Sequence, residues 1–166
     1  MEEKKEYAVC MIRDVNNSGV TGLVKFIQEE GKKLHVIGSV SGLTPGLHGM
    51  HIHEFGNLMD NGKWAGDHFN PYGSKKHGSL NDVERHAGDL GNIEADASGY
   101  ASFNFEVNGL KLIGGIDFDN IIGRSMMIHA LDDDLGAGGN EESCKTGNVG
   151  HHVAMGIIGL SGPLAH

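Results

Sequence analysis

The chain has 166 residues, enough for one domain with a substantial core, and we expect a single domain over residues 1–166. Its formal net charge of −9 argues against a nucleic-acid-binding protein, because such binding depends on basic residues that neutralise phosphates. The 27 glycines follow no period of three, which excludes collagen, and no apolar stretch is long enough to predict a membrane span.

Short runs that alternate apolar and polar residues, or that are rich in β-branched residues, recur along the chain. Segments rich in glycine and asparagine separate them, as turns do. In chain order, the predicted strands cover residues 8–13, 22–27, 34–40, 49–53, 100–107, 121–129 and 152–160. The predicted turns include 16–19, 42–46, 92–99 and 108–109. No segment has the sustained period of an amphipathic helix, so the pattern predicts an all-β sandwich or barrel.

Two long, glycine-rich stretches, 55–87 and 130–150, have no strand pattern of their own. Loops of this length in a compact domain are usually functional or disordered. The first contains three candidate metal ligands, which favours function. The second contains a run of aspartates at 132–134 and two glutamates at 141–142, and from charge alone a solvated acidic loop is an equally good interpretation.

Six histidines and one aspartate are the most informative feature of the sequence. His51 and His53 are separated by a single residue on a predicted strand. Their side chains should therefore lie on the same face, roughly 7 Å apart. Imidazoles with one carboxylate suit Cu(II) and Zn(II) and are too soft for Mg(II) or Ca(II). A satisfied core position or a solvated surface explains most isolated histidines, but not a cluster of this size. The candidate ligands are His51, His53, His68, His77, His86, Asp89 and His129.

The first seven residues are polar and lack the apolar centre of a signal peptide. The two cysteines, Cys10 and Cys144, are far apart in sequence and belong to no Cys-x-x-Cys motif. Free thiols in a reducing compartment are therefore expected. Together these features predict a cytoplasmic location.

Over nearly the whole chain, the sequence closely resembles the copper/zinc superoxide dismutases. The most specific motifs are His-x-His at 51–53, Gly-Asp-Leu-Gly-Asn at 88–92 and Asp-Leu-Gly-Ala-Gly-Gly-Asn-Glu-Glu-Ser at 134–143. The resemblance implies an eight-stranded Greek-key β-barrel whose two long loops shape a channel to the metals. It also implies an oxidoreductase with copper and zinc as cofactors, which converts superoxide to dioxygen and hydrogen peroxide.

Carried over position by position, the resemblance divides the ligands into two sets that share one histidine. Asp133 matches a carboxylate outside both sets that orients His51 and His77. Lys145 and Thr146 match residues of the channel. The copper set is His51, His53, His68 and His129, and the zinc set is His68, His77, His86 and Asp89, so His68 would bridge the two metals.

The chain departs from the family where a disulfide normally ties the first long loop to the last strand. The matching positions here are Gly62 and Met155, so that bond cannot form. Cys10 and Cys144 match other places and do not replace it. Trp64, close to the gap, either covers it by packing or is simply an exposed aromatic residue in a loop.

His152, preceded by His151, stands where the family has an arginine beside the copper. Arginine is always charged, whereas a histidine is mostly neutral at pH 7. One interpretation is a tolerated substitution in a slower enzyme, with reduced guidance of the anion. The other is a changed role, such as a non-enzymatic copper- and zinc-binding protein for storage or delivery. The complete set of seven ligands favours the enzyme.

A further set of positions matches the apolar contact patch of dimeric family members. Such a patch on a monomer would be a liability, so we expect a homodimer. The missing disulfide normally braces this contact, and we therefore expect the dimer to be weak. The matching residues are Phe55, Gly56, Ile122, Gly123, Gly159 and Leu160.

Overall fold

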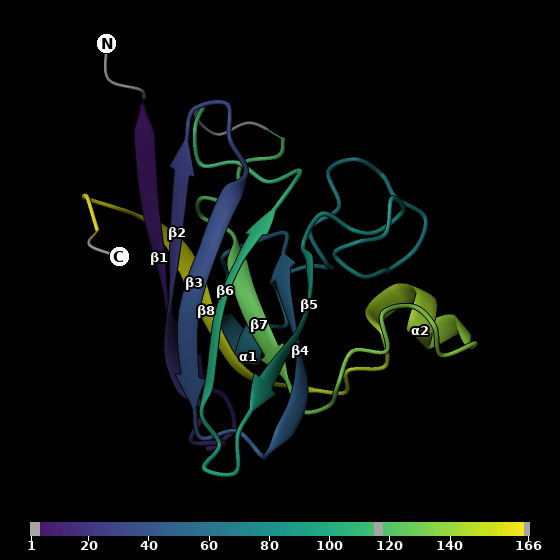
Figure 1. The fold of residues 1–166 in the computed structure, drawn as a ribbon. Coiled ribbons are helices and arrows are strands. Elements are labelled where there is room, and N and C mark those ends of the chain that lie inside the picture. The colour runs from purple at the N-terminus through teal and green to yellow at the C-terminus, as the bar shows by residue number, and fades with distance from the viewer. Residues whose placement is uncertain (1–3, 115–117, 165–166) are drawn as a thin grey trace.

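A computed structural model describes residues 4–114 and 118–164 as a nearly closed barrel of strands with two short helices (Figure 1). No helix among these residues is long and apolar enough to cross a membrane. The elements are β1 (Lys5–Asp14), β2 (Thr21–Glu29), β3 (Leu34–Ser41), β4 (Gly46–His53), α1 (Met59–Gly62), β5 (Asp89–Ala95), β6 (Ala101–Val107), β7 (Ser125–His129), α2 (Glu141–Thr146) and β8 (His152–Ser161).

The strands are hydrogen-bonded in the order β5-β4-β7-β8-β1-β2-β3-β6, and all of these pairs are antiparallel. β3 pairs with β6 rather than with β4, so the chain crosses the barrel between β3 and β4. The edge strands β5 and β6 pack against each other and nearly close the barrel. Neighbours that are not consecutive in the chain are typical of a Greek key. The predicted all-β, eight-stranded Greek-key barrel is confirmed.

The alternation of side chains along the strands fills the barrel with one apolar core. In β2, Val24 and Phe26 are fully buried, and Lys25 between them is not. β1 repeats this pattern with Ala8 and Cys10. Because successive side chains point to opposite faces of a strand, each strand presents every second residue to the interior. Burial of one large apolar side chain contributes about 1.5–3 kcal/mol.

Two predicted boundaries in the barrel are wrong. Residues 92–95, expected to begin a turn, belong to β5, where Asn92 pairs with Gly49 and Ala95 with Gly46. Pairing with β4 here outweighs the turn preference of glycine and asparagine. The strand expected over 121–129 begins only at Ser125. Before it, Gly123 has φ +82° and the Arg124 N–H donates to the Ile121 carbonyl, which forms a turn.

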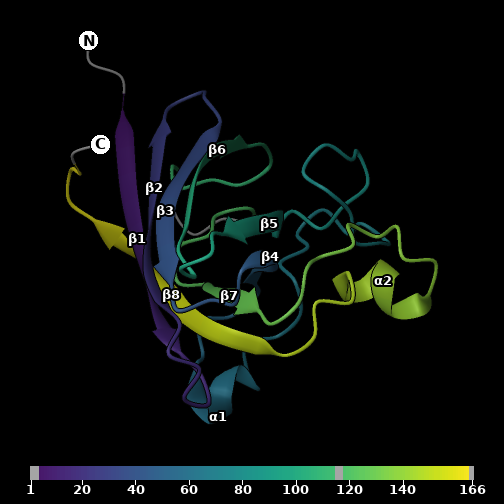
Figure 2. The same ribbon diagram turned by 60° about the horizontal axis from the view of Figure 1, so that its bottom comes forward.

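The two long loops leave the barrel on the same side, with α2 within the second of them (Figures 1 and 2). They are joined by the His77 N–H, which donates to the Cys144 carbonyl at 2.7 Å. The first loop also pairs with the end of β4, because the Phe69 N–H donates to the Ile52 carbonyl. All residues of β7 are buried as a result, on its outer face as well as on its inner one.

The first long loop packs on the barrel through thioethers where the family has a disulfide. A Cβ atom at Gly62 would lie 2.8 Å from Met127 Cε and 3.0 Å from Met155 Sδ, so the two methionines fill the space beside this glycine. Val15 and Ala65 complete a small second apolar cluster with them. Trp64 lies outside this cluster and is 52% exposed, which favours its interpretation as an exposed loop residue.

Candidate metal centre

Three of the candidate ligands lie on the outer face of two adjacent strands. His51 and His53 on β4 alternate with Ile52, which points into the core, and His129 follows the core residue Ile128 on β7. Since β4 and β7 are paired, the three rings share one patch. One nitrogen from each of them lies within 4.8 Å of the others. The long loops bury this patch, so all three rings are nearly inaccessible to solvent.

Asp89, at the start of β5, is the centre of a second cluster. Its Oδ1 lies 2.9 Å from Nδ1 of His68, 2.9 Å from Nδ1 of His77 and 3.3 Å from Nδ1 of His86. Its Oδ2 accepts the backbone N–H groups of His86 and Gly78. One carboxylate therefore gathers three imidazoles from the first long loop.

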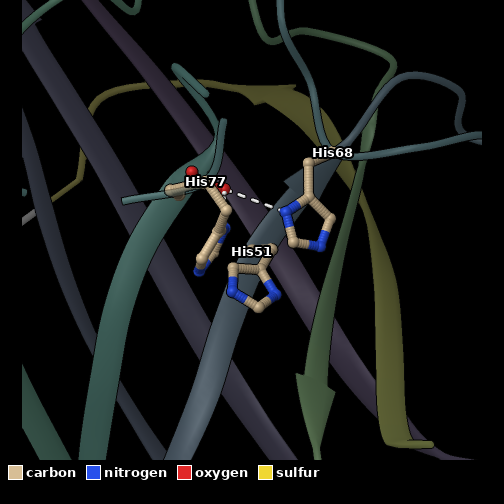
Figure 3. Close-up of side chains that lie close together, drawn as sticks. His51, His68 and His77 are labelled. Atoms are coloured by element: carbon tan, nitrogen blue, oxygen red, sulfur yellow. Dashed lines mark hydrogen bonds and ion pairs between the residues drawn. The ribbon is translucent and has the colours of Figure 1, made fainter. Parts of the chain in front are cut away.

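His68 lies between the two clusters. Its ring stacks on that of His51 with centroids 4.0 Å apart, and it is edge-on to His77 at 5.2 Å (Figure 3). It is also edge-on to His53 at 5.1 Å. Because Nδ1 of His68 faces Asp89, its Nε2 is left for the other cluster. His68 is thus placed to contribute one nitrogen to each side.

Five buried ring nitrogens of these clusters have no hydrogen-bond partner among the described residues. A buried polar atom left unpaired costs about 1–3 kcal/mol, and folded proteins rarely leave one so. Imidazole nitrogens are good ligands for copper and zinc, and coordination would satisfy all five. The residues therefore fit these two metals. The unpaired atoms are His51 Nδ1, His53 Nε2, His77 Nδ1, His86 Nδ1 and His129 Nε2; those of His77 and His86 lie near Asp89 but not in hydrogen-bonding geometry.

Asp133, in the second long loop, joins the two clusters from outside. It accepts from His51 Nε2 at 2.7 Å and from His77 Nε2 at 2.7 Å, which leaves Nδ1 of both rings facing inward. The side chain of Asn92 pairs with the backbone N–H and carbonyl of Asp133. A Cβ atom at Gly147 would lie 2.0 Å from Asp133 Oδ1, so only glycine leaves room for the carboxylate.

Backbone carbonyls orient two more rings. His53 Nδ1 donates to the Gly66 carbonyl at 2.9 Å, and His129 Nδ1 donates to the Gly150 carbonyl at 3.2 Å. Each of these bonds requires the proton on Nδ1 and leaves Nε2 as the lone-pair nitrogen. Both long loops therefore help to select the tautomer that can bind a metal.

Burial keeps His51, His53 and His129 neutral. It lowers the pKa of His51 to about 4 and that of His53 to about 3, and it holds the pKa of His129 well below its usual value. Burial raises the pKa of Asp133, but the hydrogen bonds from His51 and His77 outweigh it and lower this pKa to about 2. Neutral imidazoles around an ionised carboxylate are the state that binds metal ions.

A cavity of about 770 Å³ opens over the two clusters between the long loops. Lys145 and Thr146, predicted as channel residues, both line it. Lys145 Nζ is paired with Glu141 Oε1 at 2.9 Å, and Thr146 Oγ1 donates to Glu142 Oε1 at 2.8 Å. Other side chains along the wall are His53, Glu54, Asp67, His68, Asn70, Lys75, His86, His129, Leu131, Glu142, Cys144, Asn148 and Val149.

His152, predicted to contribute to catalysis, is not among the residues that line this cavity in the described part of the chain. Its Nε2 donates to the Asn61 carbonyl of the first long loop. Its ring is edge-on to that of His129, with centroids 6.3 Å apart. The side chain thus spans the gap between a candidate copper ligand and the first loop, and its effect on an anion stays a prediction.

Sequence reasoning did not identify Arg85 or the role of Asn92. The guanidinium of Arg85 donates to the carbonyls of His86 and Ala87, both at 2.9 Å, and to that of Asn108 at 3.0 Å. It therefore fixes the turn that carries His86 towards Asp89. In the sequence, these two residues stand out only by their positions. Arg85 directly precedes a candidate ligand, and Asn92 ends the motif at 88–92.

Comparison with known proteins gives a family and two close relatives. The family described as copper/zinc superoxide dismutase (SODC) matches residues 20–158. A protein of Onchocerca volvulus named extracellular superoxide dismutase [Cu-Zn] is 48% identical over 158 residues, which cover 93% of this chain and 76% of that protein. Another from the same organism, named superoxide dismutase [Cu-Zn], is 48% identical over 145 residues, 85% of this chain and 89% of that protein.

The cytoplasmic location predicted from the sequence is corrected by the first of these relatives, which is named extracellular. The prediction rested in part on unpaired cysteines, and the structure gives them a different reason. Cys10 is buried in the barrel and Cys144 is exposed on α2, so the fold keeps the two thiols apart in any compartment. Their free state therefore says nothing about where the protein resides.

The metal-free protein should lose stability as pH falls from 6.5 towards 4. An unfolded histidine has a pKa near 6.5, so in this window the unfolded chain binds protons that buried His51 and His53 do not. The folded-state pKa of Asp133 is lowered to about 2, so its unfolded carboxyl, which begins to bind protons at the acid end of this window, adds to the loss. His77, whose hydrogen bonds to Asp133 and Asp89 raise its pKa to about 9, is protonated in the folded chain throughout. The contribution of His77 to stability is lost only above this window, as pH rises towards 9.

Urea unfolding of the metal-free protein at pH 6.5, 5.5 and 4.5 measures this effect. A His53→Gln variant should show a shallower dependence on pH, while His151→Gln, at an exposed position, should match the unmodified protein. Stability that stays constant or rises on acidification would contradict the burial of neutral imidazoles.

Proposed function

The chain belongs to the copper/zinc superoxide dismutase family, and we propose which of its residues perform the dismutation of superoxide. The activity is that of an oxidoreductase that uses copper and zinc to convert superoxide to dioxygen and hydrogen peroxide. The observation that carries the assignment of residues is the pair of histidine clusters, with the His68 ring between them and five buried nitrogens that lack a partner among the described residues.

In this proposal the two metals share His68. Three imidazoles and one carboxylate form a closed set that suits zinc, which is redox-silent. Copper, when bound, supplies the one-electron chemistry that zinc cannot. The proposed copper ligands are His51, His53, His68 and His129, and the proposed zinc ligands are His68, His77, His86 and Asp89, in agreement with the distances to Asp89 Oδ1.

The protein's own side chains and backbone carbonyls are proposed to transfer a proton and to orient the ligand rings. Formation of hydrogen peroxide from two superoxide anions consumes two protons. His68 Nε2 is the atom proposed to take up and return one of them, because Nδ1 of this ring faces Asp89 in the other cluster. Asp133 holds His51 and His77 in the required tautomer, and the Gly66 and Gly150 carbonyls do the same for the other two rings.

A non-enzymatic protein for copper and zinc storage or delivery is the less favoured alternative. Two relatives that are 48% identical over most of this chain are both named as dismutases. A histidine placed between two clusters also has no evident use in a protein that only stores metal. An extracellular location, as in the name of one relative, is part of the proposed function.

Metal analysis tests the ligand assignment. The protein should bind one copper and one zinc per chain, because the seven ligands make two sets of four only if one is shared. His53→Ala should weaken copper binding and abolish dismutation while zinc is retained, and His86→Ala should release zinc first. His35→Ala, on β3 and hydrogen-bonded to Asn104, is the control and should bind both metals. A protein that takes up only zinc at saturating copper would disprove the assignment.

His152 is proposed to guide the anion less well than the arginine that family members have at this place. Its ring is held at the Asn61 carbonyl, and a neutral imidazole supplies no fixed charge. His152→Arg should raise the second-order rate of dismutation by roughly two- to five-fold at pH 8 and low salt, where screening is weak. Pulse radiolysis across pH and ionic strength measures it.

The matched control for that change is His151→Arg, which adds the same charge at the neighbouring exposed residue. It should leave the rate nearly unchanged. A His152→Arg variant that is no faster than the unmodified protein under any condition would show that this position does not limit capture of the anion.

We also propose a homodimer that uses the exposed apolar patch around Phe55 and Leu160. These side chains are 54% and 65% exposed, and nearby Ile157 is 46% exposed. Phe55 and Ile157 line one shallow depression together with Leu58, Met59 and Gly123, among others. Contiguous apolar surface of this kind commonly marks an interface.

Analytical ultracentrifugation over a dilution series tests the dimer. The unmodified chain should sediment as a dimer at high concentration and dissociate on dilution. Leu160→Glu should shift it to monomer, whereas Val83→Glu, a fully exposed apolar residue in the first long loop, should not. Monomer at every concentration would rule out the proposed interface.

A further inference from the structure

The cavity above the histidines must admit a small anion into a protein with a net charge of −9. Its volume of about 770 Å³ is far larger than a diatomic anion, so shape cannot select the substrate. Three carboxylates, those of Glu54, Asp67 and Glu142, line the cavity and oppose the entry of an anion. Electrostatic steering is a known property of this family, and here it requires a cation that offsets these charges.

The two cationic positions expected from the resemblance are both engaged elsewhere. Lys145 Nζ lies 2.9 Å from Glu141 Oε1, so its charge is largely compensated by that carboxylate. His152 does not line the cavity, and its Nε2 donates to the Asn61 carbonyl. Neither side chain offers an uncompensated positive charge to an anion that enters.

Lys75 does offer one. It is the other lysine in the cavity wall, its side chain is exposed, and no ion pair with it is formed by any described residue. Its backbone is fixed on both sides. Before it, the Asn70 side chain accepts the Ser74 N–H and donates to the Ser74 carbonyl, and after it the His77 N–H is bonded to Cys144.

The neighbouring Lys76 carries the same charge but is not part of the cavity wall. The sequence alone gives no reason to distinguish the two lysines. The fold distinguishes them because, of the two, only Lys75 lines the cavity, whose wall also includes His68 and His86.

We propose that Lys75 supplies the uncompensated positive charge that draws superoxide into the cavity over the copper ligands. It guides the anion and takes no part in the electron or proton transfer. The inference rests on the proposed ligand assignment, since the cavity leads to those histidines.

Three variants of the copper- and zinc-loaded protein test the role of Lys75: Lys75→Gln, Lys75→Arg and Lys76→Gln. Lys75→Gln and Lys76→Gln change the net charge equally, so any difference between them reports position. The dismutation rate per bound copper is measured by pulse radiolysis from low to high ionic strength. The affinity for azide, a small monoanion, is measured by optical titration as a readout independent of turnover.

Lys75→Gln should lower the second-order rate roughly two- to five-fold at low salt, with a smaller loss at high salt. It should also weaken azide binding. Lys75→Arg should retain both properties, and Lys76→Gln should resemble the unmodified protein. Equal effects of Lys75→Gln and Lys76→Gln would overturn the proposal, because net charge alone would then explain the loss.

A lower rate in Lys75→Gln with unchanged azide affinity and unchanged salt dependence would also overturn it. Copper and zinc content is determined for each variant. Failure of the ligand assignment would appear separately, as copper that is retained when His53 is replaced by alanine.

Discussion

The proposed metal centre depends on the hydrogen bonds that the carboxylate of Asp133 accepts. It joins a histidine on the barrel, His51, to a histidine in the first long loop, His77, and is itself carried by the second long loop. All three side chains are buried, so removal of the carboxylate would leave two ring N–H groups without a partner and out of reach of water. Asn92 holds the backbone of Asp133 by two hydrogen bonds, and Gly147 leaves room for its carboxylate.

The same burial links metal binding to folding. The loops close over rings whose inward nitrogens have no partner among the described residues, which costs free energy in the metal-free state. Metal ions that bind only the folded chain recover that cost and stabilise the loops by mass action. This matters more here than in relatives with a disulfide, because Gly62 packs against Met155 where a covalent bond would otherwise join the first loop to β8. Metal and loop structure therefore form one cooperative unit.

Much of this could be predicted from the sequence because it depends on local patterns. Strand alternation placed His51 and His53 on one face, and the turn-separated runs predicted an all-β fold. The remainder depends on contacts between distant segments. Pairing with β4 made β5 a strand despite its glycine and asparagine, and the hydrogen bond to Asn61 turned His152 away from the cavity. No local pattern distinguishes Lys75 from its neighbour.

The central claim is that His68 belongs to both clusters. The most direct test replaces zinc with Co(II) and records the electron paramagnetic resonance spectrum of the Cu(II) form. Two paramagnetic ions that share an imidazolate are magnetically coupled, so the Cu(II) signal should be strongly diminished with Co(II) and restored with diamagnetic zinc. An unchanged Cu(II) signal in the cobalt-substituted protein would contradict a shared histidine and the account built on it.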